Sequence, residues 1–208
     1  MKRFIIAALA LFVLCLTGCT SEITLELKKD GAVAVSFNGV AGEAFAALIN
    51  SATGSQGDSV IFDTKQIEAE MTGSGFEGVK AVTKTGRDLT ITMTDKKHKS
   101  AMFSSGAVAV KDGKLEAHLD SKTLLSFYDQ ADSQTIMFLD MLLCPVFNDE
   151  KMTREEYLET IEAFYGKEIA DEMKAADFKV TIINPDGSKI VRNIKLTKLL
   201  TLDETIRF

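Results

Sequence analysis

Glu116, His118 and Asp120 are the residues whose types and spacing come closest to a metal site. Carboxylate and imidazole groups bind zinc, and alternate residues of a β-strand point to one face, so the three side chains could converge on a single ion. A water-exposed strand face carries the same pattern, and we favour that interpretation. His98, the other histidine, lies in the basic run 96–99, which is typical of a solvated loop. The sequence therefore predicts neither a metal site nor a cofactor.

Nucleophilic catalysis finds little support in the chain. Cys144 has no basic neighbour in sequence that would activate its thiol, and we expect it to be a small buried apolar residue. The sequence also lacks the G-x-S-x-G, S-x-x-K, H-E-x-x-H and Walker A patterns of known catalytic or phosphate-binding sites. An enzyme is the least favoured alternative, and we expect a non-catalytic protein.

The N-terminal segment has the features of a lipoprotein signal peptide. Lys2 and Arg3 form a short basic region, and Phe4 to Leu16 is an uncharged run that is too short to cross a bilayer. The run ends in Leu16-Thr17-Gly18-Cys19, which resembles the bacterial lipobox, in which an aliphatic residue and two small residues precede an obligatory cysteine. The alternative is an uncleaved N-terminal helix whose cysteine is accidental.

The resemblance to a lipobox implies a specific route of processing. The Cys19 thiol would receive a diacylglyceryl group, a peptidase would cut between Gly18 and Cys19, and the new amine could take a further acyl chain such as palmitate. Two or more acyl chains hold a protein stably on a membrane. Residues 1–18 are then the signal peptide, and residues 19–208 are the mature domain on a membrane of the bacterial cell envelope, with inner and outer membrane both open.

The composition limits the possible partners. The 208 residues carry a formal charge of −6 without any basic tract, which argues against nucleic acid, because neutralising phosphates requires clustered Lys and Arg. With 46% apolar and 26% charged residues, the chain can build a core. The expected partners are the membrane, through the lipid anchor, and either a lipid ligand or another envelope protein.

Tight turns organise the mature chain. Asp30-Gly31, Asp112-Gly113 and Asp186-Gly187 supply the positive φ angles of hairpin turns, and a fourth turn is expected at Gly86-Arg87. Apolar and polar residues alternate on either side, which predicts strands with one buried and one wet face. The sequence thus predicts an antiparallel sheet of about four β-hairpins. The clearest alternating runs are 23–28, 33–37, 89–94, 115–120 and 178–182. After the last turn, Val191 to Leu196 are expected to continue the final hairpin.

Helices are expected between these hairpins. A stripe of apolar residues marks a helix at 43–52, and Asp63 with Gln66 marks a second start. Ser121 can cap a third helix that carries Leu124.

The third helix opens a helical insertion that runs from about 121 to 176. Within it, Thr153 and Glu156 form a capping box, and the helix that follows would place Phe164 on its apolar side. Gly166 would end this helix, and another short helix is expected at 167–176.

An almost wholly apolar segment, IMFLDMLLCPVF, lies inside the insertion at 136–147. A helix that is apolar on all sides is either fully buried or meets something apolar. We favour a core helix, and the alternative is a cleft or surface that meets lipid or protein. The residues that would line such a cleft are Ile136, Phe138, Leu139, Asp140, Leu142 and Leu143, with Asp140 as the polar element.

The pattern as a whole predicts one α+β domain in which strands from both ends share a sheet and the insertion packs on one face. The opening hairpin 23–37, the segment 62–71 and the closing hairpin around Asp186-Gly187 also distantly resemble the LppM-type family of small bacterial lipoproteins. That resemblance implies a sheet-and-helix fold that can enclose a lipid or glycolipid, and it brings no catalytic residues. The long helical insertion departs from the mainly β core of the family.

The sequence therefore predicts a lipid-anchored, non-catalytic lipoprotein that binds a lipid or other apolar ligand in a cleft. The alternative is a structural lipoprotein whose acidic face docks on another envelope protein. A charged residue in place of Leu142 separates the two. It would abolish ligand uptake in the first case, and in the second it would unfold the domain, because burying an unpaired charge costs several kcal/mol.

Overall fold

The computed structural model describes residues 20–53, 62–128, 140, 143, 152–202 and 204–208. Its strands are β1 (Thr20–Leu27), β2 (Val33–Val40), β3 (Glu77–Val82), β4 (Asp88–Asp95), β5 (Val108–Lys111), β6 (Lys114–Leu119), β7 (Asp177–Ile183), β8 (Lys189–Lys195) and β9 (Ile206–Arg207). Its helices are α2 (Glu43–Thr53), α3 (Thr64–Gly73), α4 (Ala101–Ser104), α5 (Ser121–Tyr128), α7 (Arg154–Tyr165), α8 (Lys167–Ala175) and α9 (Leu196–Thr201).

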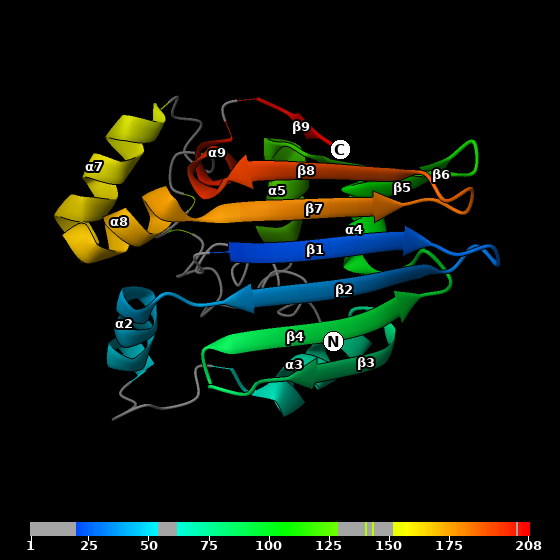
Figure 1. Ribbon diagram of the computed structural model, residues 1–208, viewed down its shortest axis with the longest axis horizontal. Coiled ribbons are helices and arrows are strands. Elements are labelled where there is room, and N and C mark those ends of the chain that lie inside the picture. The colour runs from blue at the N-terminus through cyan, green and yellow to red at the C-terminus, as the bar shows by residue number, and fades with distance from the viewer. Residues whose placement is uncertain (1–19, 54–61, 129–139, 141–142, 144–151, 203) are drawn as a thin grey trace.

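The main sheet has six strands in the order β3-β4-β2-β1-β7-β8 (Figure 1). It confirms the expected α+β fold, with the first hairpin, β1–β2, and the last, β7–β8, side by side in one sheet. Two details correct the prediction. The β1–β7 pair is parallel, because β7 is reached through a long crossover that returns to the start of β1. The hairpin β5–β6 leaves the main sheet and forms a separate three-stranded sheet with β9.

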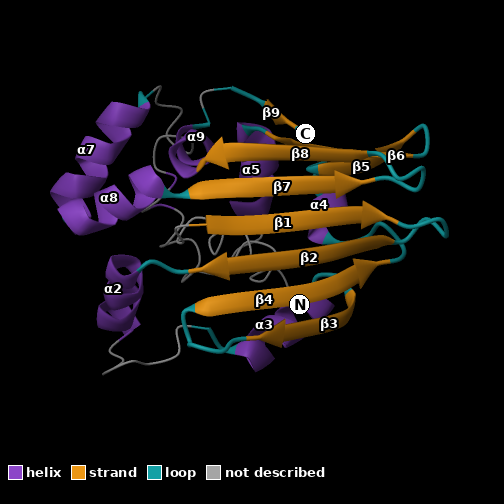
Figure 2. Cartoon of the chain, in the orientation of Figure 1, coloured by secondary structure: helices purple, strands orange, loops and turns teal. Residues whose placement is uncertain are grey.

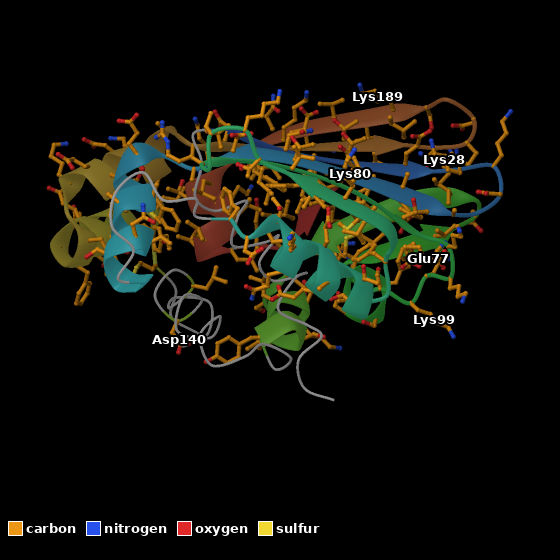
Figure 3. The ribbon with its side chains drawn as sticks, turned by 90° about the horizontal axis from the view of Figure 1, so that it is seen from below. Lys28, Glu77, Lys80, Lys99, Asp140 and Lys189 are labelled. Carbon is orange, nitrogen blue, oxygen red and sulfur yellow. The ribbon has the colours of Figure 1, made fainter. Side chains whose placement is uncertain are left out.

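Alternation along the strands gives the main sheet a buried face and an uncovered face. Helices α3 and α5 and the small sheet lie under the buried face (Figures 1 and 3). The opposite face is covered by none of the elements that the structure describes. Lys80 and Lys189 lie on that side in Figure 3.

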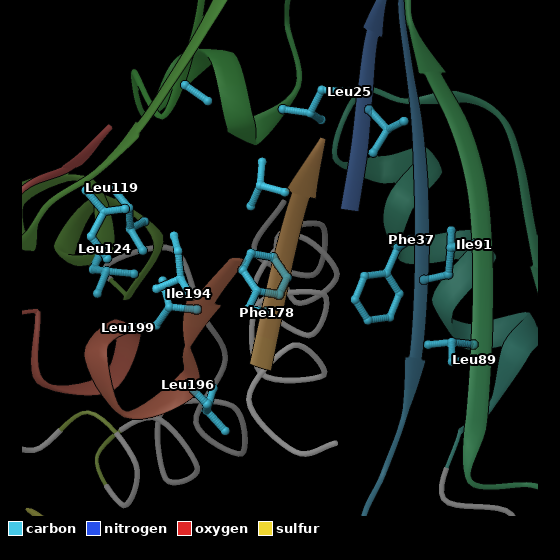
Figure 4. Close-up of a cluster of buried hydrophobic side chains, with 14 of the residues drawn as sticks. Leu25, Phe37, Leu89, Ile91, Leu119, Leu124, Phe178, Ile194, Leu196 and Leu199 are labelled. Carbon is cyan, nitrogen blue, oxygen red and sulfur yellow. The ribbon is translucent and has the colours of Figure 1, made fainter. Parts of the chain in front are cut away.

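The core fills the space between the buried face and the elements beneath it. Phe37 and Ile91 from the sheet are fully buried, and Leu124 from α5 and Leu199 from α9 belong to the same cluster (Figure 4). The alternation predicted for 23–28, 33–37, 89–94, 115–120 and 178–182 places the apolar members of each run in this core or packed against it. The sequence pattern therefore correctly predicts which side of each of these strands is buried.

Helix caps follow the local sequence closely. Asp63 accepts hydrogen bonds from the backbone N–H groups of Lys65 and Gln66 at the start of α3, and Thr153 and Glu156 form the predicted capping box of α7. The cap of α5 differs by one residue. Asp120, rather than Ser121, accepts a bond of 2.8 Å from the Thr123 N–H, while the Thr123 hydroxyl accepts one of 3.0 Å from the Asp120 N–H.

The helical insertion divides between two places. Its first helix, α5, packs under the main sheet, whereas α7 and α8 lie at one end of it (Figure 2). This is the end at which β1 and β7 begin, and we call it the N-terminal end of the sheet. The hairpin turns β1–β2 and β7–β8 lie at the opposite end.

The structure departs from two predictions for single residues. Phe164 shares the side of α7 that carries the buried Tyr157 and Ile161, as predicted, but it is 76% exposed because it lies in the last turn of the helix, beyond the packed part of that side. The strand predicted to continue to Leu196 stops at Lys195, and Leu196 begins the short helix α9. Leu196, Leu199 and Leu200 are buried at helical spacing, which explains the switch.

Candidate functional site

Cys19, the predicted lipidation site, directly precedes the first described residue, and its own position lies outside the described residues. The same is true of four residues of the predicted cleft: Ile136, Phe138, Leu139 and Leu142. Asp140 and Leu143 are described. The structure therefore locates two members of the proposed cleft and not its shape.

Asp140 and Leu143 lie in different environments. Asp140 is exposed, and its carboxylate accepts a hydrogen bond of 2.8 Å from the Tyr128 hydroxyl at the end of α5. Leu143 is 0% exposed and belongs to the main core cluster. The described part of this segment thus resembles a core-packing element with a polar residue at its surface.

His118 and Glu116 lie on β6, as the sequence predicts, and Asp120 directly follows the strand, but only two of the three interact. The His118 Nε2 is 3.9 Å from an Asp120 carboxylate oxygen, and Glu116 is exposed. Asp120 is mainly a helix cap, and the hydrogen bond from the Thr123 N–H holds the pKa of Asp120 below its usual value. Within the described part of the chain, no three His, Cys, Asp or Glu residues are grouped closely enough to hold a metal ion.

A cavity of about 490 Å³ lies on the uncovered face at the N-terminal end of the sheet. Strand register accounts for its floor. Thr90, Asn38, Glu22, Lys179 and Asn193 form one row of side chains across five strands. The next row toward the sheet end contributes Asp88, Val40 and Asp177, and the remaining lining residues are Ser21, Gly39 and Leu89.

Within the row that crosses five strands, two pairs of polar side chains interact with each other. The Thr90 hydroxyl donates a hydrogen bond of 2.9 Å to the Asn38 side-chain oxygen, and the Lys179 ammonium lies 3.0 Å from the Glu22 carboxylate. Each pair fixes the direction of donors and acceptors before any ligand arrives. Such pairs on a solvated face contribute little to stability, about 0–1 kcal/mol for the ion pair.

The cavity carries a negative charge. Asp88 accepts hydrogen bonds from the Thr85 hydroxyl and from the N–H groups of Thr85 and Lys84, and the Thr85 hydroxyl contributes most to keeping the pKa of Asp88 below its usual value. Asp177 is paired with Lys195 at 3.0 Å beside the cavity. Lys179 is the cation among the lining residues, against the carboxylates of Glu22, Asp88 and Asp177.

Gly39 and Ser21 face each other across β2 and β1 beneath the cavity. A Cβ atom on Gly39 would lie 2.7 Å from the Phe37 ring and 3.1 Å from the Ser21 Oγ. The Ser21 Oγ is itself buried and has no hydrogen-bond partner among the residues that the structure describes. A glycine at position 39 is therefore required by the packing of the Phe37 ring.

A second contact ties the helices together at the N-terminal end of the sheet. The Glu172 carboxylate of α8 accepts hydrogen bonds from the N–H groups of Ala44 (2.9 Å) and Phe45 (3.1 Å) in the first turn of α2. Gly42 makes room for it, since a Cβ there would lie 2.1 Å from a Glu172 oxygen. We call this contact the α2–α8 clasp; it joins α2, which follows β2, to α8, which precedes β7.

Sequence reasoning did not predict the cavity. Its lining residues come from five strands, and only the register between those strands brings them together. Most of them are, taken alone, ordinary polar residues on the solvent-exposed side of a strand. The alternation that predicted the wet faces was the available signal, but it does not say which strands are neighbours.

Comparison with models of known protein families, with curated proteins and with solved structures found no match. Among the described residues, no helix combines the length and the apolar character needed to cross a bilayer.

Proposed function

We propose that this chain is a lipid-anchored, non-catalytic binding protein of the bacterial cell envelope, acylated at Cys19. In this proposal the uncovered face of the main sheet is its recognition surface. The observation that carries it is the position of β1, which begins at Thr20, immediately after the cysteine of the lipobox-like sequence. The cavity lies at the same end of the sheet, so a ligand bound there would be held at the membrane surface.

The chemistry of the cavity favours a sugar as the ligand. Asn38, Asn193 and Thr90 offer both hydrogen-bond donors and acceptors, while Val40, which is 47% exposed, offers an apolar patch. A sugar ring combines hydroxyl groups with apolar C–H edges and matches this mixture. The excess of carboxylates disfavours phosphate-rich ligands, because like charges repel.

Membrane anchoring is tested by expressing the full chain in a bacterium. We expect the protein in the membrane fraction, with a mass that corresponds to cleavage before Cys19 and an added diacylglyceryl group. The Cys19→Ala variant should retain its signal peptide and lack the acyl mass. An unprocessed wild-type chain would overturn the anchoring proposal.

Sugar binding is tested by calorimetry with the lipidated protein in detergent and oligomers of N-acetylglucosamine as the probe. Asn38→Leu and Asn193→Leu should each weaken binding by about tenfold, or about 1.4 kcal/mol, for the loss of hydrogen bonds to a polar ligand. Thr92→Ala is the matched control, because Thr92 lies on the same face one row away from the cavity. Absence of heat with the wild-type protein would refute the sugar as the ligand.

The apolar segment 136–147 supports a second candidate, the binding of a lipid. The supporting observation is the sequence of the segment, in which Asp140 is the one acidic residue among apolar ones. The exposed Asp140 carboxylate accepts a hydrogen bond from the Tyr128 hydroxyl. Native mass spectrometry of the purified protein would detect a bound adduct of lipid mass beyond the covalent acyl chains. If Leu142→Asp removes this adduct and leaves the fold intact, the segment is a cleft; if it unfolds the domain, the segment is core.

A further inference from the structure

Phe164 is the most exposed large apolar side chain in the described part of the protein. It is 76% exposed, whereas the next, Val40, is 47% exposed. It occupies the last turn of α7, and its ring centroid lies 6.2 Å from that of Tyr165, which packs against the core cluster. Isolated exposed apolar residues are common, so the position of Phe164 in the molecule decides its significance.

The strand register places Phe164 close to the start of the mature chain. Thr20 pairs with Asp177 in the parallel β1–β7 ladder, and α8 ends at Ala175, two residues before Asp177. Phe164 precedes α8 by three residues. From the rise of a helix and the reach of an extended chain, Phe164 lies no farther than roughly 35 Å from Thr20. Figure 1 shows α7 and α8 at the end of the sheet where β1 begins.

The proposed lipid anchor leaves almost no linker at this end. Cys19 is the residue before β1, so the acylated cysteine would hold the first strand within one residue of the bilayer. Helices α7 and α8 extend beyond the start of β1 (Figure 1). Because no linker separates Cys19 from β1, helices that extend beyond the start of β1 would lie against the bilayer that holds the acylated cysteine.

We propose that the corner between α7 and α8 rests on the lipid bilayer and that the Phe164 ring inserts into its interfacial region. This inference rests on the proposed function, since it requires acylation of Cys19. An aromatic ring is favourable at the boundary between headgroups and acyl chains, and it would add a second, non-covalent contact to the lipid anchor.

The acidic residues of α7 do not share the side of the helix that carries Phe164. At about 100° per residue, the exposed carboxylates Glu155, Glu159 and Glu162 lie about 140–180° around the helix from the ring, which lies on the side of the buried Tyr157 and Ile161. Near the ring, Lys167 opens α8 and pairs with Asp171 at 2.7 Å.

The sequence contains no tryptophan, so a single introduced indole reports its own surroundings. The test compares Phe164→Trp with Val110→Trp in the full lipidated protein, reconstituted in phosphatidylcholine vesicles with or without brominated acyl chains. Val110 is 37% exposed on β5, at the end of the molecule opposite α7 (Figure 1), and is the matched control. Both variants replace an exposed apolar residue, and their thermal unfolding should match that of the wild type.

We expect the emission of Phe164→Trp to shift to shorter wavelength on reconstitution and to lose intensity with brominated lipid, while Val110→Trp does neither. If the protein floats with the vesicles and the two variants behave alike, this inference is overturned and the anchoring proposal stands. If the mature protein carries no acyl mass and does not float, both the anchoring proposal and this inference fail. Mass spectrometry and flotation thus separate the two failures.

Discussion

At the scale of single residues, the α2–α8 clasp shows how two positions far apart in sequence depend on each other. Glu172 satisfies two N–H groups in the first turn of α2, which has no earlier helical turn to supply acceptors. Its negative charge also lies at the positive end of that helix. Gly42 contributes only space, because any side chain there meets the Glu172 carboxylate.

We predict that Glu172→Ala and Gly42→Ala each lower the free energy of unfolding by about 1–3 kcal/mol, because both leave the same N–H groups unpaired. The double variant should lose clearly less than the sum of the two, since either change already breaks the clasp. Urea unfolding followed by circular dichroism measures the cycle. Glu168→Ala, an exposed position on the same helix, is the control and should stay within about 0.5 kcal/mol. Additive losses would show that Gly42 and Glu172 act independently.

Asp95 is the fully buried carboxylate that organises the loop after β4. It accepts backbone hydrogen bonds from Lys97, Lys99 and Ser100 at 3.0, 3.2 and 2.9 Å. Burial raises the pKa of Asp95, but hydrogen bonds from Ser100, Lys99 and Lys97 outweigh burial and leave it below the ordinary value of 3.8. Because the folded state lowers this pKa, the stabilisation is fully present above the unfolded value and is lost as the pH falls through the folded value.

We therefore predict that Asp95→Asn costs about 1–3 kcal/mol at neutral pH, since an amide is a weaker acceptor and presents N–H groups to N–H donors. The difference from the wild type should shrink as the pH falls below about 4, where the wild-type carboxyl becomes protonated. Unfolding curves measured from pH 7 to pH 2.5 test this. Asp112→Asn is the control, because asparagine tolerates the positive φ of that turn residue. A constant difference at every pH would contradict the role of the charge.

Residues whose partners are local were predicted from the sequence, and those with distant partners were not. Asp63 caps α3 through bonds to Lys65 and Gln66, which are its neighbours in the chain. Glu172 is separated from its partner Ala44 by 128 residues. In the sequence it is one of several acidic residues on a short helix, and no local rule distinguishes it.

At the scale of elements, α7 shows how far a capping signal determines a helix. The Thr153 side chain accepts a hydrogen bond of 3.2 Å from the Glu156 N–H, and the Glu156 carboxylate accepts one of 2.8 Å from the Thr153 N–H. We predict that Thr153→Ala lowers the free energy of unfolding by about 1 kcal/mol through loss of the cap. Thr160→Ala is the matched control in the same helix. The Thr160 hydroxyl only donates to the Glu156 carbonyl, so its removal should be neutral or slightly stabilising.

Thermal unfolding monitored by circular dichroism distinguishes these two variants of α7. Equal effects of Thr153→Ala and Thr160→Ala would show that the capping box contributes nothing beyond the general loss of a hydroxyl. The sequence predicted this helix and both of its ends, because the cap and Gly166 are adjacent to it. It did not predict the exposure of Phe164, which depends on how far along α7 the packing of its buried side extends.

Strands were likewise predicted individually rather than as a sheet. The alternation in each hairpin identified its buried side, and all four predicted hairpins are present. Nothing in that alternation distinguishes β5–β6, which forms the small sheet, from the hairpins of the main sheet. Likewise, the sequence of neither strand predicts that β1 and β7 pair in parallel.

At the scale of the whole molecule, that parallel pair brings the first described strand, β1, beside the C-terminal hairpin β7–β8. β1 lies at the centre of the main sheet only because β7 and β8 cover its second edge. The proposed binding cavity depends on the same arrangement, since Asp177, Lys179 and Asn193 complete its lining. The N-terminal end of the main sheet therefore cannot form until the C-terminal hairpin has been added.

We predict that a chain ending at residue 176 does not fold. It would lack Phe178, Ile182 and Leu199, three buried side chains whose burial contributes about 5–9 kcal/mol in total, comparable to the whole stability of a typical domain. It would also expose the second edge of β1 as an unpaired strand edge. A chain ending at residue 202 is the control: it loses the short β9 pairing with β6, the buried Ile206 and the Lys198–Glu204 ion pair, and it should stay folded with a lower melting temperature. Cooperative thermal unfolding by the chain ending at residue 176 would show that the N-terminal strands form a stable sheet without the β1–β7 ladder.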